Sequence, residues 1–245
     1  MTSFVAPPLK GLFETSPIAV WVSQKSAGHV ALTYQIDTKN GHALGASEDR
    51  SGSLAEASSN SFDLEFLDDN RVQNGPIDWT VTNKQRLVST VELDEFSKVS
   101  FPVYLHNVVA KAELKFGIDW LGNIGSIKPD GTYCPPKNRP GFTCATYLCE
   151  VFRSHGLQVV DEKTWPTDTI EIFEWFKSIL ARFLRQEGRE ATISSIESTR
   201  PLKRLTPAEF AGAASSGSKS WPMCEAQARQ LAMQIKQDFE SKFPR

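Results

Sequence analysis

The chain has few cysteines, no excess of charge of either sign and no long hydrophobic run. Its four cysteines, at positions 134, 144, 149 and 224, form neither the paired spacing of a metal site nor a dense disulfide framework. We therefore expect no metal and a reduced compartment. A formal net charge of -2 over 245 residues supplies no basic field that would gather nucleic acid or an anionic membrane.

Two further absences concern targeting. No apolar stretch is long enough to span a bilayer, and residues 1–8 contain no charged leader followed by an apolar core. These features predict a cytoplasmic protein without a membrane span and without nucleic acid as a partner. The hydrophobic content of 40% is sufficient for one large domain.

The stretch from Arg139 to Gly156 predicts a loop that delivers a cysteine to the start of a buried helix. Thr143 is an N-cap candidate, because its hydroxyl can accept a backbone N–H of the first turn. Gly156 is expected to end the helix. The apolar positions recur at intervals of three and four residues: Tyr147, Leu148, Val151 and Phe152.

Cys144 falls in the first turn of this helix, where exposed N–H groups and the positive end of the helix dipole favour a thiolate. That setting suits a nucleophile. Free cysteine is, however, among the most buried residue types and usually behaves as a small hydrophobe. Cys149 lies further along the same helix, and we interpret it as a core residue.

Near the start of the chain, residues 17–24 and 28–37 alternate as strands do. In the second of these, Val30 and Leu32 share one face, whereas His29 and Ala31 share the other. Asn40-Gly41 is the signature of a two-residue hairpin turn, which predicts a return strand at 42–48.

The remaining segments predict a mixed α and β protein. We expect strands at 61–67 and 77–82, and a strand followed by a short helix within 87–98. The segment 101–116 is ambiguous between a strand and a buried helix, 117–140 is expected to be a long irregular loop, and 157–160 is expected to be extended. Helices are expected at 169–187, 207–213 and 222–243. The aromatic stripe of the 169–187 helix is expected in the core. We divide the chain into a domain at 1–187 and a C-terminal helical extension at 188–245 that packs on it.

Papain-type chemistry requires a thiolate at a helix start, an imidazole on a neighbouring strand and a polar group that orients the imidazole. Here His29 heads a strand and Cys144 heads a helix, with the histidine first in the chain. In this order, and in the stretches Gly28-His29-Val30-Ala31-Leu32 and Phe142-Thr143-Cys144-Ala145-Thr146-Tyr147, the chain resembles the circularly permuted NlpC-like papain-fold hydrolases, which include the lecithin:retinol acyltransferase-like proteins.

This resemblance implies an α+β, permuted papain-like fold in which an antiparallel sheet packs against the cysteine-bearing helix. It implies a cysteine hydrolase or acyltransferase that acts on amide or ester bonds of a peptide, protein or acyl substrate, with no cofactor. The matched architecture spans roughly residues 17–160.

Related proteins carry the orienting residue on the second hairpin strand, where this sequence offers Glu48 and His42. With Asn40-Gly41 as the turn, Thr33 faces Glu48, and His42 lies roughly 30 Å along the strands from the register of His29. A bulge or a longer loop would be needed for either residue to reach His29. We prefer Glu48 and keep His42 as the alternative.

The backbone N–H of Cys144 is expected to form part of an oxyanion hole. Within the 117–140 loop, Asp119, Trp120 and Asn123 are the candidates to line a substrate cleft. The alternative is structural, with Trp120 buried and Asp119 capping a turn. His106 and His155 are interpreted as structural histidines.

A second hypothesis makes the protein a non-catalytic binding or immunity protein. The polar loops 50–60 and 188–220 would then contact a partner, and the histidine and cysteine would have no joint role. The sequence leaves the substrate, the choice between hydrolysis and acyl transfer, and the oligomeric state open.

Overall fold

The computed structural model describes residue 4 and residues 16–23, 28–35, 61–66, 72–76, 86–109, 117–137, 141–183 and 201–243. Its centre is an antiparallel sheet of five strands in the order β4-β3-β2-β1-β5. The strands are β1 (Ile18–Ser23), β2 (His29–Gln35), β3 (Ser61–Phe66), β4 (Val72–Pro76) and β5 (Arg86–Thr90). The α+β class predicted from the sequence is confirmed.

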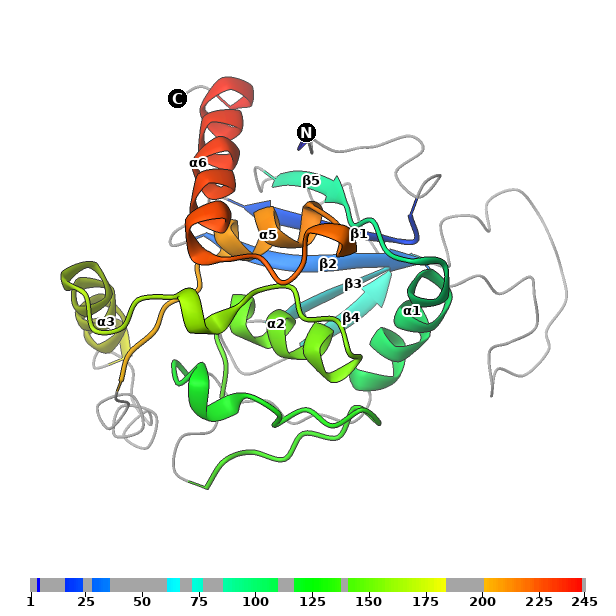
Figure 1. Cartoon of the computed structure of the whole chain (residues 1–245), viewed down its shortest axis with the longest axis horizontal. Helices are drawn as coiled ribbons and strands as arrows, with labels where there is room; N and C mark the ends of the chain where they lie inside the picture. Colours follow the sequence, from blue (N-terminus) through cyan, green and yellow to red (C-terminus); the bar gives the residue numbers. More distant parts are fainter. Residues whose placement is uncertain are drawn as a thin grey trace, which may run out of the picture.

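The α-helices are α1 (Glu95–Val109), α2 (Cys144–Ser154), α3 (Ile170–Phe183), α5 (Pro207–Ser215) and α6 (Glu225–Lys242), and short 3-10 turns lie at Leu121–Asn123, Glu162–Thr164 and Ser218–Ser220. In Figure 1, α2 and α5 lie along the sheet, α1 stands at one end and α3 is set apart at the other.

The sheet separates two apolar clusters, because side chains alternate between the faces of a strand. On one face, Val20, Val30 and Leu32 join the main core with residues of α2 and α5, including Leu148, Phe152, Phe210 and Ala214. On the other face, Ala19, Trp21, Ala31 and Val88 form a separate cluster. Within the described residues, α2 and α5 therefore pack on a single face of the sheet.

The predicted strands at 17–24, 28–37 and 61–67 are confirmed as β1, β2 and β3, and the strand expected at the start of 87–98 is β5. The strand predicted at 77–82 lies outside the described residues, whereas β4 was not predicted. The apolar run after residue 100 continues α1 to Val109 rather than starting a new element. Pro102 lies inside this helix, although proline normally breaks a helix interior.

The hairpin prediction needs a correction. Both edges of β2 are occupied, by β1 over residues 29–34 and by β3 over residues 32–35. Thr33 therefore pairs with Asp63, where the predicted hairpin placed Glu48. Asn40-Gly41 signals a turn but does not determine which later segment becomes the neighbouring strand. The segment 42–48 itself, with His42 and Glu48, lies outside the described residues.

The apolar stripe of α3 packs in a hydrophobic cluster of its own. Ile172 and Phe176 are buried there with Ile118 and Leu202, separate from the main core. Phe173, Trp175, Ile179 and Leu180 are partly buried against this cluster. The predicted burial is therefore confirmed for Ile172 and Phe176, but helical periodicity does not show which cluster an apolar face joins.

The C-terminal segment contributes directly to the main core. Phe210, Ala211 and Ala214 of α5 and Ile235 and Phe239 of α6 are buried with the residues of β1, β2 and α2. The helices predicted at 207–213 and 222–243 are confirmed as α5 and α6. The predicted boundary at 187/188 lies outside the described residues, but the helices beyond it share one hydrophobic core with the sheet.

Candidate functional site

The start of α2 is built as the sequence predicts. The Thr143 hydroxyl accepts the backbone N–H of Thr146 (3.2 Å), and the Thr146 hydroxyl accepts that of Thr143 (2.9 Å). This reciprocal pair is a capping box, which satisfies two backbone N–H groups that the helix itself leaves without partners. Cys144 follows as the first helical residue, and Gly156 ends the turn after the helix with φ +87°.

The two cysteines of α2 occupy different environments. Cys144 is half-buried and packs against the edge of the main core, whereas Cys149 is 2% exposed inside it. Burial raises the pKa of the Cys149 thiol to about 12, because an apolar surrounding disfavours the thiolate. Cys149 is therefore a core residue, as predicted, and Cys144 is the accessible thiol of this helix.

The loop before α2 is held by a buried amide. The Asn123 side chain donates to the Asp119 carbonyl (2.7 Å) and accepts the backbone N–H of Gly141 (3.3 Å). The same Gly141 N–H lies 3.0 Å from the hydroxyl of Tyr133. Gly141 adopts φ +118°, a conformation that favours glycine. Asn123 thereby fixes the backbone three residues before Cys144.

The other two residues predicted to line a cleft have structural roles. The Asp119 carboxylate accepts the backbone N–H of Gly122 (2.9 Å), so it caps the short turn at Leu121–Asn123. A Cβ on Gly122 would collide with that carboxylate, so a larger residue there would force the Asp119 side chain to move. Trp120 is 4% exposed and packs edge-on against Trp165, with 5.5 Å between ring centroids. Their placement agrees with the structural alternative.

A buried acid, Glu150, anchors the same loop and was not recognised in the sequence. Its carboxylate accepts the backbone N–H of Gly125 (2.5 Å) and lies 3.3 Å from the guanidinium of Arg153. Arg153 also donates to Glu162 (3.0 Å). Burial raises the pKa of Glu150 to about 7, although Arg153 and the loop N–H groups oppose the shift. The available signal was an acid placed between apolar positions of a buried helix.

His29 lies on the face of the sheet that α2 does not cover. The register pairs Ser23 with His29 and Trp21 with Ala31, which places the histidine on the Trp21 side of β2. The His29 and Trp21 ring centroids are 5.6 Å apart. The guanidinium of Arg86 lies over the same Trp21 ring at 4.0 Å.

Cys144, by contrast, packs with the cluster to which Val30 and Leu32 contribute. The backbone of β2 thus stands between the imidazole of His29 and the sulfur of Cys144. The described structure does not bring together the pair that the sequence predicts. The reason is the strand's alternation, since His29 and Val30 must project to opposite faces.

His155, another histidine of the described residues, lies at the opposite end of α2 from Cys144. His155 follows the last residue of α2, where its ring contacts Phe101 and Tyr104 of α1. Burial lowers the pKa of His155. His106 lies in the last turn of α1. Helix α2 has eleven residues, so its two ends are about 16 Å apart.

Among the described residues, no group of three histidine, cysteine, aspartate or glutamate side chains is placed to hold a metal ion. No helix of this part of the chain combines the length and apolar character that a bilayer crossing requires. No protein-family model matches the chain, no curated protein matches it, and no solved structure matches it.

Proposed function

We propose that this protein is a thiol-dependent hydrolase or acyltransferase in which Cys144 is the nucleophile. The observation that carries the proposal is the position of Cys144, which is partly exposed and first in a capped helix, whereas Cys149 of the same helix is buried in the core. The family resemblance at residues 28–32 and 142–147 supports the same chemistry, with an amide or ester of a peptide, protein or acyl compound as substrate.

In this reaction the Cys144 thiolate attacks the carbonyl carbon, and a C–S bond forms as the bond to the amine or alcohol breaks. The leaving group takes up a proton, and water or an acyl acceptor then releases the acyl group from sulfur. N–H groups at the helix start are suited to bind the oxyanion. The step also needs a base close to the sulfur.

Two histidines are candidates for that base. His29 would have to leave Trp21 and turn to the α2 side of the sheet. Gly28 precedes it with φ +79°, and a Cβ on Gly28 would lie 3.7 Å from Pro207 of α5, so the backbone at this point already borders that side. His42, which lies outside the described residues, is the other histidine to test.

A second function is favoured by one specific observation. The separation of His29 and Cys144 by the sheet is the arrangement expected of a non-catalytic interaction protein, in which both residues serve packing. The two functions predict different reactivity for the same thiol.

The test compares alkylation rates of individual cysteines by iodoacetamide at pH 6 to 7, read by mass spectrometry on the full chain. Cys134 is exposed and serves as the reference for an ordinary accessible thiol. A hydrolase requires Cys144 to react faster than Cys134, and His29→Ala or His42→Ala to slow Cys144 alone. If Cys144 reacts no faster than Cys134 and neither substitution changes its rate, the protein is not a thiol enzyme.

A further inference from the structure

The outer side of α1 carries an apolar stripe that no described element covers. Phe96 is 77% exposed, Val99 71% and Val103 38%. Their spacing of three and four residues places all three on one side of the helix. The inner side is buried through Phe101 and Leu105. Large apolar side chains exposed together in this way mark an interaction site more often than isolated ones do.

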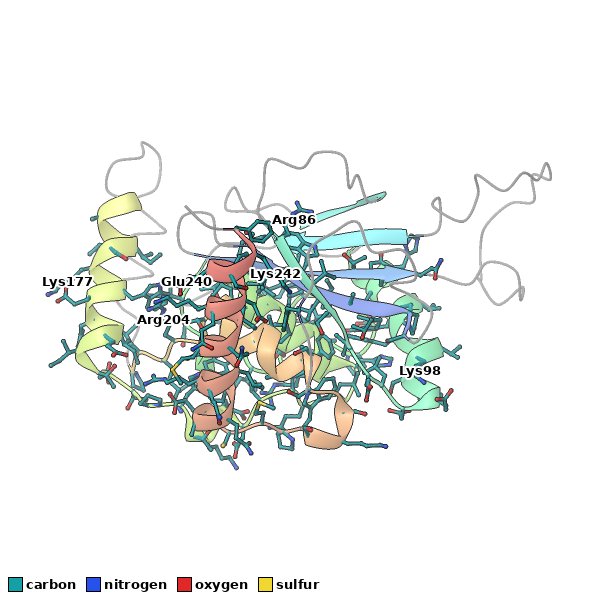
Figure 2. The ribbon with its side chains drawn as sticks, turned by 90° about the horizontal axis from the view of Figure 1, so that it is seen from above. Arg86, Lys98, Lys177, Arg204, Glu240 and Lys242 are labelled. Atoms are coloured by element: carbon teal, nitrogen blue, oxygen red, sulfur yellow. The ribbon has the colours of Figure 1, made fainter. Side chains whose placement is uncertain are left out.

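The position of α1 leaves this stripe accessible. Figures 1 and 2 both place α1 at the end of the molecule opposite α3. Lys98, labelled in Figure 2, marks this helix. Lys98 is paired with Glu95 at 2.6 Å, but the Glu95 side chain is 89% exposed, so this ion pair contributes little and can rearrange.

The two ends of the stripe are chemically complementary. Glu95 lies in the first turn of α1 and His106 in the last, and both are exposed. At 100° per residue, both fall on the same side of the helix as Val99. A carboxylate therefore ends the stripe at the N-terminal side, and an imidazole that can donate a hydrogen bond ends it at the C-terminal side.

We propose that the occupant of this stripe is a second copy of the chain, bound through α1 in an antiparallel pair about a two-fold axis. In that arrangement Val99 of each copy faces Val103 of the other, and Glu95 of each copy faces His106 of the other. The patch is thus self-complementary, as a two-fold interface must be. Parallel pairing would instead place Glu95 beside Glu95.

The size of the stripe determines the strength of the association. Three exposed apolar side chains and their flanks cover well under the roughly 800 Å² per partner of a standard interface. The dimer is therefore weak, and its population rises with protein concentration. An obligate dimer would need a larger and continuous apolar surface.

The first experiment is sedimentation velocity on the full chain over a hundredfold range of concentration. The wild type is expected to shift from monomer towards dimer, and Val99→Asp to remain monomeric throughout. Ile170→Asp is the matched control, because Ile170 is equally exposed (82%) but lies on α3. It should associate as the wild type does. Thermal melts followed by circular dichroism verify that each variant is folded.

The second experiment tests the antiparallel geometry with a charge exchange. Glu95→Lys alone removes the carboxylate that accepts from His106, and His106→Glu alone places two carboxylates opposite one another. Each should weaken the homodimer. In a mixture of the two variants, the introduced lysine of one copy faces the introduced glutamate of the other, and the native Glu95 faces the native His106. A heterodimer at least as strong as the wild-type dimer is therefore expected.

Three outcomes would overturn the proposal. The wild type could stay monomeric, the Val99→Asp variant could still dimerise, or the mixture could associate no more strongly than either variant alone.

Discussion

Replacing Glu150 by glutamine should change how the stability of the protein depends on pH. Glu150 is 4% exposed, and its carboxylate is held between the loop N–H of Gly125 and the guanidinium of Arg153. Burial raises its pKa from 4.5 to about 7. The folded protein therefore binds a proton at this site more tightly than the unfolded chain does.

The sign and size of the effect follow from linkage. Because the folded pKa exceeds the unfolded one, the stabilising contribution of protonation is complete below pH 4.5 and is lost as the pH rises to about 7. At 1.36 kcal/mol for each pKa unit, the loss is about 3 kcal/mol. Glutamine has no such transition. The difference in unfolding free energy between Glu150→Gln and wild type should thus move by about 3 kcal/mol in favour of the variant between pH 4 and pH 8.

The assay is urea unfolding of both proteins at five or six pH values. The quantity to follow is how the difference in unfolding free energy between Glu150→Gln and wild type changes with pH. Glu174→Gln is the control, because Glu174 pairs with Lys177 on the exposed side of α3. It should leave the pH dependence of the wild type unchanged. If this difference in unfolding free energy stays constant from pH 4 to pH 8, or moves in favour of the wild type, burial does not raise the pKa of Glu150 as argued.

Two further substitutions test single contacts, one at the start of α2 and one between α5 and α6. Thr143→Ala removes the hydroxyl that accepts the Thr146 N–H and should lower stability by about 1 kcal/mol in urea unfolding, whereas Thr143→Ser should retain most of it; equal stability of the alanine variant would count against the capping box. Gly212→Ala would place a Cβ 2.6 Å from the Cβ of Leu231, so it should destabilise by about 1 to 3 kcal/mol despite the better helix propensity of alanine. Adding Leu231→Gly, which removes that Cβ, should relieve the contact, and a double-mutant cycle without coupling would show the expectation to be incorrect.

Local signals in the sequence were sufficient where one segment determines its own structure. The strand that begins at His29 and the helix that begins at Cys144 both start within a residue of their predicted positions. Thr143 caps the helix and Gly156 ends it, because each acts on its own turn.

Predictions that depend on distant segments were less successful. The predicted neighbour of β2 was wrong, because β3, about thirty residues further along the chain, pairs with the edge that a local hairpin would have used. The pairing of His29 with Cys144 required a choice of sheet face, and alternation along β2 indicates which residues share a face but not which face receives α2. Glu150 went unrecognised because the Gly125 N–H that it accepts lies in a distant loop, and its position between apolar residues of the helix was the one local signal.

Buried polar side chains hold the backbone of the long loop before α2. An irregular segment of more than twenty residues is uncommon in a compact domain unless it serves a site, since its backbone groups need partners. Here Asn123 and Glu150, both nearly inaccessible, supply those partners at opposite ends of the loop. Asn123 acts on Gly141, immediately before the helix that Cys144 begins. Because Asn123 fixes the backbone that leads into α2, and Glu150 ties that helix to the loop, the start of α2, rather than the start of β2, is the place to search first for activity.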